Sequence, residues 1–217
     1  MKVFGELVKG YEIPVLNERE IRAAAGIMFL ATFISLMMII NQGNFVPIKY
    51  VIIVFLIDFS IRLFIGPKFS PVLILGRFIV RNQNPEYVGA KQKKFAWYIG
   101  LVLAAAMFIL MVVFNTYSII TGLVCLICLI LMFFESAFGI CIGCKMYQLF
   151  YKDKVQYCPG EVCDVKAKHD IQKISLKQVL GTLAFIAFII LGSLLFKNEL
   201  NAKPSDLFKV SEVSQTH

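Results

Sequence analysis

Charged residues are scarce in this chain of 217 residues. Only 17% of the residues are charged, 59% are hydrophobic, and the mean hydropathy is +0.76. A soluble protein of this size needs a charged exterior, which long stretches of this sequence lack. The composition therefore excludes one soluble globular domain and indicates a protein whose apolar stretches are covered by lipid.

Histidine is scarce too, and the common catalytic motifs are missing. His169 lies in a charged segment and His217 ends the sequence, and we expect both to be solvated. The sequence has no nucleotide-binding glycine loop, no serine–histidine–acid set and no metalloprotease helix motif. The first 22 residues hold no apolar run, and no lipidation signature is present. We therefore expect neither a cleaved leader nor a lipid anchor.

The net charge of +8 does not indicate a nucleic-acid partner. The 22 basic residues are spread between apolar runs and form no tract with interleaved stacking aromatics. The tendency of membrane proteins to keep basic loops in the cytoplasm explains them more simply. We expect the bilayer, and no nucleic acid, to be the partner of this chain.

Five segments are apolar enough to cross a bilayer core about 30 Å thick, which needs roughly 20 helical residues. They are residues 23–40, 47–65, 95–114, 118–141 and 179–196. The sequence therefore predicts an all-α membrane protein, a helical bundle of about five transmembrane helices. Four of them form a core at 23–144, and the fifth is a C-terminal span at 179–196.

Basic residues set the expected orientation. Residues 41–46 and 115–117 carry no charge, whereas 66–94 holds six basic residues against one acid, and 145–177 adds seven lysines. Basic connections stay in the cytoplasm. We therefore expect an inner-membrane protein with a cytoplasmic N-terminal segment at 1–22, a cytoplasmic cysteine-containing loop at 145–178 and a polar tail at 197–217 on the outer side.

The apolar stretch 71–80 is too short to span the membrane. Gly76 and Arg77 interrupt it, and the Ser70-Pro71 step is typical of a helix start. We expect a short interfacial or re-entrant helix here, and a sixth half-span is the alternative.

Several motifs occur together between residues 15 and 150. They are Asn17-Glu18-Arg19 before Arg22-Ala23-Ala24-Ala25; Asp58-Phe59, Arg62, Gly66-Pro67 and Ser70-Pro71; Lys94-Phe95-Ala96 with Ile99-Gly100; and Glu135, Phe138-Gly139, Cys141, Gly143-Cys144 and Tyr147. This combination resembles a family of bacterial membrane proteins catalogued as domain of unknown function 4395. The resemblance implies a compact bundle of about four helices in the bacterial inner membrane, and it brings no established activity.

The six cysteines occur as three pairs, Cys125 with Cys128, Cys141 with Cys144, and Cys158 with Cys163. The first pair lies in mid-span, where cysteine packs as a small hydrophobe. By the expected orientation the other four thiols face the reducing cytoplasm. Cysteine pairs there bind metal or exchange electrons more often than they form structural disulfides.

Cys141 and Cys144 are expected to end the fourth span on one side of a continuous helix. Redox pairs of this spacing usually begin a helix, where the dipole stabilises a thiolate, so a continuous helix has the wrong polarity. Lys145 could compensate, or Gly143 could break the helix so that Cys144 opens a new one. Gly139 and Gly143 form a small-residue pair that lets another helix come close. The alternative is that both cysteines are merely small apolar residues at an interface.

The segment from Cys158 to Cys163 has Pro-Gly at its centre, which is typical of a tight turn. With Cys141 and Cys144 it gives the spacing C-x2-C-x13-C-x4-C. This spacing resembles a tetrahedral thiolate site for zinc, and an iron–sulfur site is an alternative. The same four thiols could instead form two dithiols that relay electrons or persulfide sulfur, and the spacing does not decide between these readings.

Asp58, Arg62 and Glu135 carry charge inside the predicted spans. Asp58 and Arg62 are one helical turn apart and are expected to pair along their own helix. Their alternative role is a polar element in a substrate or proton path. Glu135 is expected to face the bundle interior, either protonated or paired with Arg62.

The leading hypothesis is a membrane protein that handles thiols, disulfides or reduced sulfur at the cytoplasmic face. Cys141 and Cys144 would be the reactive pair, Cys158 and Cys163 the partner pair, and a cytoplasmic thiol or sulfur-carrier protein the exchange partner. The alternatives are a four-thiolate metal-binding membrane protein, and a small transporter or accessory subunit whose cysteines are structural. Five spans make a small permease, so the transporter alternative favours a homo-oligomer.

Overall fold

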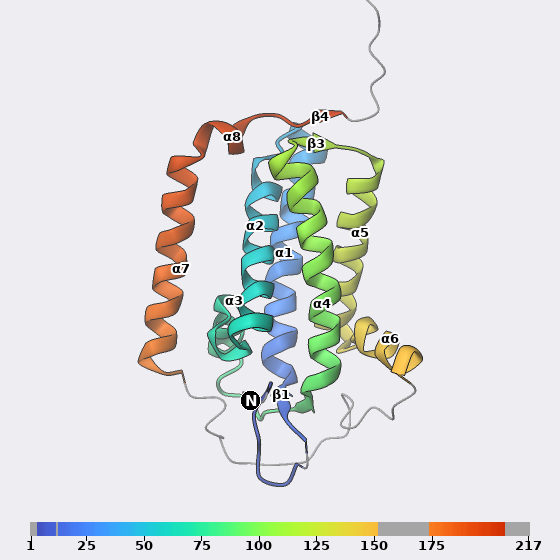
Figure 1. Ribbon diagram of the computed structural model, residues 1–217, viewed down its shortest axis with the longest axis vertical. Coiled ribbons are helices and arrows are strands. Elements are labelled where there is room, and N and C mark those ends of the chain that lie inside the picture. The colour runs from blue at the N-terminus through green and yellow to red at the C-terminus, as the bar shows by residue number, and fades with distance from the viewer. Residues whose placement is uncertain (1–3, 12, 152–173, 207–217) are drawn as a thin grey trace, which may run out of the picture.

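The computed structural model describes residues 4–11, 13–151 and 174–206, and these form a bundle of upright helices (Figure 1). Among these residues, four helices are long and apolar enough to cross a membrane. They are α1 (Glu18–Gln42), α4 (Ala90–Met107) continued by the π-helical turn η3 (Phe108–Val113), α5 (Ile119–Phe133) continued by η4 (Phe134–Phe138), and α7 (Leu176–Leu195). The predicted all-α membrane bundle is confirmed.

The remaining predicted span is α2 (Val46–Ser60), continued by the π-helical turn η1 (Ile61–Ile65). It stands among the long helices in Figure 1 and packs against α1 and α4. Its charged residues Lys49, Asp58 and Arg62 are all buried. Because these charges lie within the bundle, the outer side of α2 can remain apolar.

Two short strands set the start of α1 and α4. Strand β1 (Val15–Asn17) pairs antiparallel with β2 (Tyr87–Gly89), with Leu16 opposite Val88. Each strand leads directly into its helix, so the two helices begin side by side at the end of the bundle that holds the N-terminal segment (Figure 1). Asn17 caps α1 by accepting a hydrogen bond from the backbone of Arg19 at 3.2 Å.

Both helices begin earlier than their apolar runs predict. The first span was expected from residue 23 and the third from residue 95, but α1 begins at Glu18 and α4 at Ala90. The additional turns contain Glu18, Glu20 and Lys93, which are buried and form ion pairs. Charges neutralised in this way can lie inside a helix that packs in the bundle, which hydropathy alone does not reveal.

The predicted short helix is present as α3 (Pro71–Ile79), which follows the 3-10 turn η2 (Pro67–Phe69). Ser70 caps it by accepting a hydrogen bond from the Leu73 amide at 3.2 Å. Gly76 permits a close approach to α1, since a Cβ atom at this position would lie 2.6 Å from the Glu20 carbonyl oxygen. Helix α3 therefore packs directly on the first turns of α1.

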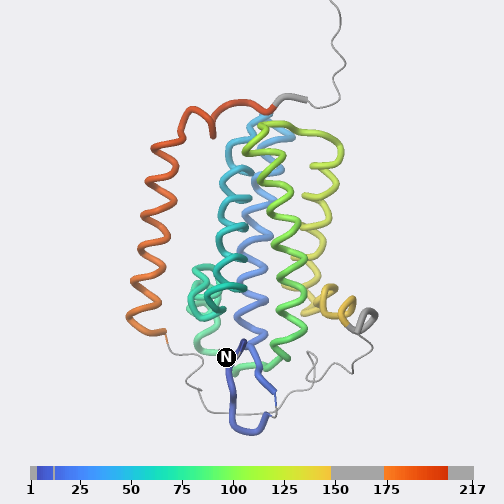
Figure 2. The backbone as a smooth tube through the Cα atoms, viewed as in Figure 1, coloured from blue at the N-terminus to red at the C-terminus, as the bar shows by residue number. Residues whose placement is uncertain are grey.

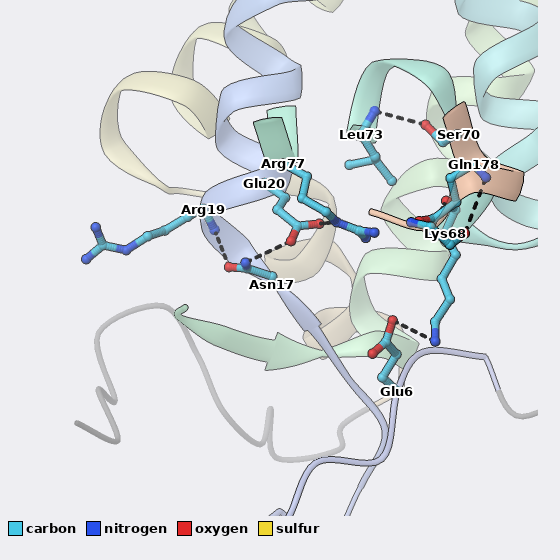
Figure 3. A network of polar contacts seen from close by, with 10 residues as sticks. Glu6, Asn17, Arg19, Glu20, Lys68, Ser70, Leu73, Arg77 and Gln178 are labelled. Carbon is cyan, nitrogen blue, oxygen red and sulfur yellow. Dashed lines mark hydrogen bonds and ion pairs between the residues drawn. The ribbon is translucent and has the colours of Figure 1, made fainter. Parts of the chain in front are cut away.

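Polar contacts hold this corner together (Figure 3). Arg77 of α3 pairs with Glu20 of α1 at 3.0 Å, and Lys68 pairs with Glu6 at 3.0 Å. The side-chain amide of Gln178, in the first turn of α7, donates to the Lys68 carbonyl at 2.9 Å. These contacts connect the N-terminal segment, α3 and the last long helix.

The opposite end of the bundle contains the two connections that carry no charge. There β3 (Thr116–Tyr117) pairs in parallel with β4 (Ser205–Asp206), which follows α8 (Lys197–Asn201) (Figure 1). The buried ammonium of Lys49 donates to the Asn115 side chain at 2.7 Å and to the Ala202 carbonyl at 2.5 Å. The chain that leaves α7 is thereby fixed to the bundle.

The fourth predicted span does not continue to Cys141, so that expectation is wrong. The helix ends at Phe138, and Gly139 adopts a left-handed conformation with φ of 66°. A new helix, α6 (Ile142–Tyr151), then leaves α5 in a different direction (Figures 1 and 2). Figure 2 also shows α7 at the outer edge of the bundle, where it contacts α3.

Candidate functional site

Cys141 and Cys144 lie at the start of α6. The Cys144 backbone amide donates a hydrogen bond to Cys141 Sγ at 3.3 Å, and the Lys145 amide donates to the Cys141 carbonyl at 3.2 Å. Cys141 therefore occupies the N-cap position, and its sulfur accepts the bond that a cap oxygen usually accepts. Both cysteines are free thiols, Cys141 buried and Cys144 partly exposed.

The break before this pair is produced at Gly139 rather than at Gly143. A side chain at Gly139 would be strained by the positive φ and would lie 3.2 Å from the guanidinium of Arg22. The same guanidinium donates to the Ala137 carbonyl at 3.3 Å. One charged side chain of α1 therefore covers the end of η4.

Gly143 has a separate function, which is to let α6 approach α4. A Cβ atom on Gly143 would lie 2.7 Å from the Cβ of Ala96. The two glycines, expected to act as one small-residue pair, therefore act on different neighbours. Gly143 fixes where the first turn of α6, and with it the Cys144 thiol, lies against the bundle.

A buried ion cluster lies beside the thiols. Lys93 is fully buried, its Nζ is 2.8 Å from Glu18 Oε2, and it also pairs with Glu135. Glu135 was expected to be protonated or paired with Arg62, and the pairing prediction is wrong because Lys93 is its partner. Lys93 was missed in the sequence because it precedes the apolar run of α4. Its sequence neighbour Lys94 and its partner Glu18 both belong to the motifs that carry the family resemblance.

The environment of Cys141 keeps its thiol protonated. A hydrogen bond with the Cys144 thiol and burial raise the pKa of Cys141 well above its ordinary range, while the positive charge of Lys93 acts in the opposite direction. Burial disfavours a thiolate because a charge is poorly solvated there. Cys141 is accordingly the less reactive partner toward external reagents, and Cys144 the more accessible one.

Asp58 and Arg62 form the expected pair along their own helix, with Nη2 and Oδ2 2.6 Å apart. Ser70 joins them: its hydroxyl donates to Asp58 Oδ1 at 2.7 Å and accepts from Arg62 Nε at 3.2 Å. Asp58 Oδ1 also accepts from the Val72 amide at 3.1 Å. The pair thereby connects α2 and η1 to the start of α3.

A cavity of about 150 Å³ runs along the bundle interior beside the site. Its wall is mostly apolar and comes from α1, α2, α4, α5 and α6. Cys125, Cys128 and Cys141 all line it, and so do Arg62, Trp97 and Glu135. Cys125 packs in an apolar cluster with Ile52 and Met107, as expected for a small hydrophobe in mid-span.

The model of one family, described as a domain of unknown function (DUF4395), matches residues 16–152. The match covers more than half of the chain. The chain belongs to this family. The DUF4395 region contains α1 to α6, the ion cluster and both cysteines of the α6 pair, and α7 lies beyond it. The predicted resemblance is confirmed. Comparison with curated proteins finds no match, and comparison with solved structures finds none.

Two predicted site residues, Cys158 and Cys163, lie outside the described residues, as do His169 and His217. The tight turn and the four-thiolate zinc or iron–sulfur site therefore stay predictions. Within residues 4–11, 13–151 and 174–206, no group of three or more His, Cys, Asp or Glu side chains is placed to hold a metal ion. In the described part of the DUF4395 chain, Cys125 with Cys128 lies in mid-span, whereas Cys141 with Cys144 lies at a helix start beside a buried ion cluster.

Proposed function

We propose that this DUF4395 protein exchanges electrons or reduced sulfur through Cys141 and Cys144 at the cytoplasmic face of the inner membrane. One observation carries the proposal: the pair begins α6, and the Cys144 amide is bonded to Cys141 Sγ. The N-terminus of a helix presents free amides and the positive end of the dipole. This is the polarity that redox pairs of this spacing use. The amides and the dipole favour a thiolate on the pair during exchange, while the hydrogen bond with Cys144 and burial keep the resting Cys141 thiol protonated.

The two thiols take different roles because their exposure differs. The thiolate of Cys144 attacks one sulfur of a partner disulfide, forms a mixed disulfide and releases the partner's other sulfur as a thiolate. Cys141 then loses its proton and attacks the Cys144 sulfur. The internal disulfide forms and the second partner thiolate leaves, so two electrons pass from the pair to the partner.

The buried ion cluster supports the second step. Lys93 is a permanent positive charge close enough to lower the pKa of Cys141, against the effect of burial. Glu135 lines the same cavity, but its negative charge opposes the Cys141 thiolate, so Lys93 is the member of the cluster that favours it. The proposed partner is a cytoplasmic thiol or sulfur-carrier protein, and Cys158 with Cys163 is the candidate second pair within the chain.

The proposed orientation follows from charge. The end of the bundle that carries the cysteine pair also carries the exposed or half-buried cations Arg19, Arg22, Lys68, Arg81, Lys91, Lys94, Lys145 and Lys177. Basic residues close to the ends of spans are retained in the cytoplasm. The N-terminus is therefore assigned to the cytoplasm and β4 to the outer side.

Thiol counting with a maleimide that adds a large mass tests the proposal. The variant that keeps only Cys141 and Cys144, with the other four cysteines changed to Ser, is purified and divided into reduced and diamide-treated samples. After denaturation, the reduced sample should take two labels and the oxidised sample none, while the chain stays monomeric on a non-reducing gel. The control Cys144→Ser should take one label after reduction. Two labels after both treatments would overturn the proposal.

A further inference from the structure

The interior cavity has room for one six-membered ring, and its lining on α4 extends from Ala96 to Met107. Its volume of about 150 Å³ equals that of an engineered apolar cavity that stays dry and binds benzene. Ile52, Ala104 and Met107 contribute to its apolar wall. Because α1, α4 and α5 are three of the apolar membrane-spanning helices, the cavity lies among helices whose outer faces contact lipid.

The few polar groups on the wall are placed for a ligand with carbonyl oxygens. Cys141 lines the cavity from the start of α6, and Arg62 lines it from η1. The guanidinium of Arg62 is held in place by Asp58 and Ser70. It is also stacked near the rings of Phe59 and Trp97, at 4.9 Å and 5.2 Å from their centroids. An arginine side chain carries five N–H donors. The contacts with Asp58 and Ser70 use two of them, so others can donate to a ligand.

We propose that this cavity binds the ring of a membrane-soluble quinone beside Cys141, and that the quinone accepts the two electrons of the Cys141–Cys144 dithiol. A dithiol partner at the cytoplasmic face then reduces the resulting disulfide, which is the proposed exchange run in the opposite direction. The inference rests on the proposed function. Both S–H bonds break, one S–S bond forms, and the quinone takes up two electrons and two protons to become a quinol with two O–H bonds. Quinones combine the three properties that this site requires, which are solubility in lipid, a planar ring and acceptance of two electrons.

The single tryptophan of the chain provides a direct binding measurement. Trp97 lines the cavity, and a bound quinone ring quenches indole fluorescence. The probe is duroquinone, because its ring is fully methylated and offers no free position for thiol addition. Titrated into the full-length protein in detergent micelles, duroquinone should quench Trp97 with a saturable curve.

Two substitutions on α4 separate cavity binding from binding elsewhere. Ala104 is buried and lines the cavity, whereas Ala106 is exposed on the opposite side of the same helix. Ala104→Phe should fill the cavity and weaken saturable quenching at least about tenfold. Ala106→Phe should change it by less than about twofold. The smaller Ala104→Leu applies the same test if Ala104→Phe does not fold. Linear quenching, or equal saturable quenching in all variants, would overturn the inference.

Electron transfer is tested under anaerobic conditions with the reduced full-length protein whose only cysteines are Cys141 and Cys144. Duroquinone should yield one quinol per chain and a Cys141–Cys144 disulfide that peptide mass spectrometry detects, and Ala104→Phe should lose both. If diamide forms this disulfide but duroquinone does not, the quinone inference fails and the proposed function stands. If neither oxidant forms it, the proposed function fails too. Saturable quenching without disulfide formation would contradict the electron-transfer step.

Discussion

Lys93 and Glu18 lie opposite each other where α4 and α1 begin, with Nζ 2.8 Å from Oε2 and both side chains fully buried. The β1–β2 ladder creates this relationship because it starts the two helices side by side. Glu135, at the end of α5, binds the same ammonium. One lysine thus joins three helices directly beside the cysteine pair.

Replacing Lys93 with Met should strongly destabilise the protein. Glu18 and Glu135 would be left in the bundle without their cation, and removing one partner of a buried ion pair costs about 3–5 kcal/mol. Lys91→Met is the matched control, since Lys91 is exposed two residues earlier on α4. It should change the free energy of unfolding by less than about 0.5 kcal/mol. Unfolding by sodium dodecyl sulfate in mixed micelles measures both, and equal effects would contradict the role of Lys93.

The position of α6 should depend on Gly143. In Gly143→Ala, the added methyl group would meet Ala96 at 2.7 Å, and such overpacking costs about 1–3 kcal/mol. The control is Gly122→Ala in α5, where the methyl group enters open space and helix propensity favours Ala by about 1 kcal/mol. Thermal unfolding should therefore shift in opposite directions for the two variants. A Gly143→Ala protein as stable as the wild type would show that α6 does not pack closely on α4.

The alkylation of Cys141 should depend on pH in a defined direction. Its pKa is raised, so the thiolate that reacts with iodoacetamide should form only well above the ordinary thiol value of about 9. The hydrogen bond with the Cys144 thiol is the largest cause. In Cys144→Ala the pH at which the alkylation rate of Cys141 reaches half its maximum should therefore be lower. The profile is measured by peptide mass spectrometry between neutral and strongly alkaline pH, and a midpoint below the ordinary value would contradict the assigned environment.

The orientation predicts which positions an impermeant maleimide can reach in intact cells. A Gln42→Cys protein without other cysteines should be labelled, since Gln42 is exposed at the end of the bundle assigned to the outer side. A protein with Cys144 alone should be labelled only after the membrane is permeabilised. Labelling of Cys144 in intact cells would place the cysteine pair outside the cytoplasm and remove the basis for a reduced dithiol.

The apolar runs of the sequence located every long helix but misplaced several ends. Hydropathy follows the lipid-facing residues, so it missed the charged first turns of α1 and α4, where Glu18 and Lys93 neutralise each other. The pairing of Asp58 with Arg62 was predictable because both lie on one helix, one turn apart.

The partner of Glu135 was not predictable, because it depends on how α4 and α5 pack. The helix break before Cys141 depends on Gly139, which adopts a left-handed conformation close to the Arg22 side chain. The apolar run continues through this position, so hydropathy does not reveal the break.

The reduction potential of the Cys141–Cys144 pair tests the central claim most directly. The variant with only these two cysteines is equilibrated in glutathione buffers, and the disulfide fraction is followed by mass spectrometry. The account predicts a two-electron transition between about −270 and −120 mV, the range of exchange-active dithiols. A pair that forms no internal disulfide in any buffer would contradict it, and so would a disulfide whose reduction potential lies below about −300 mV.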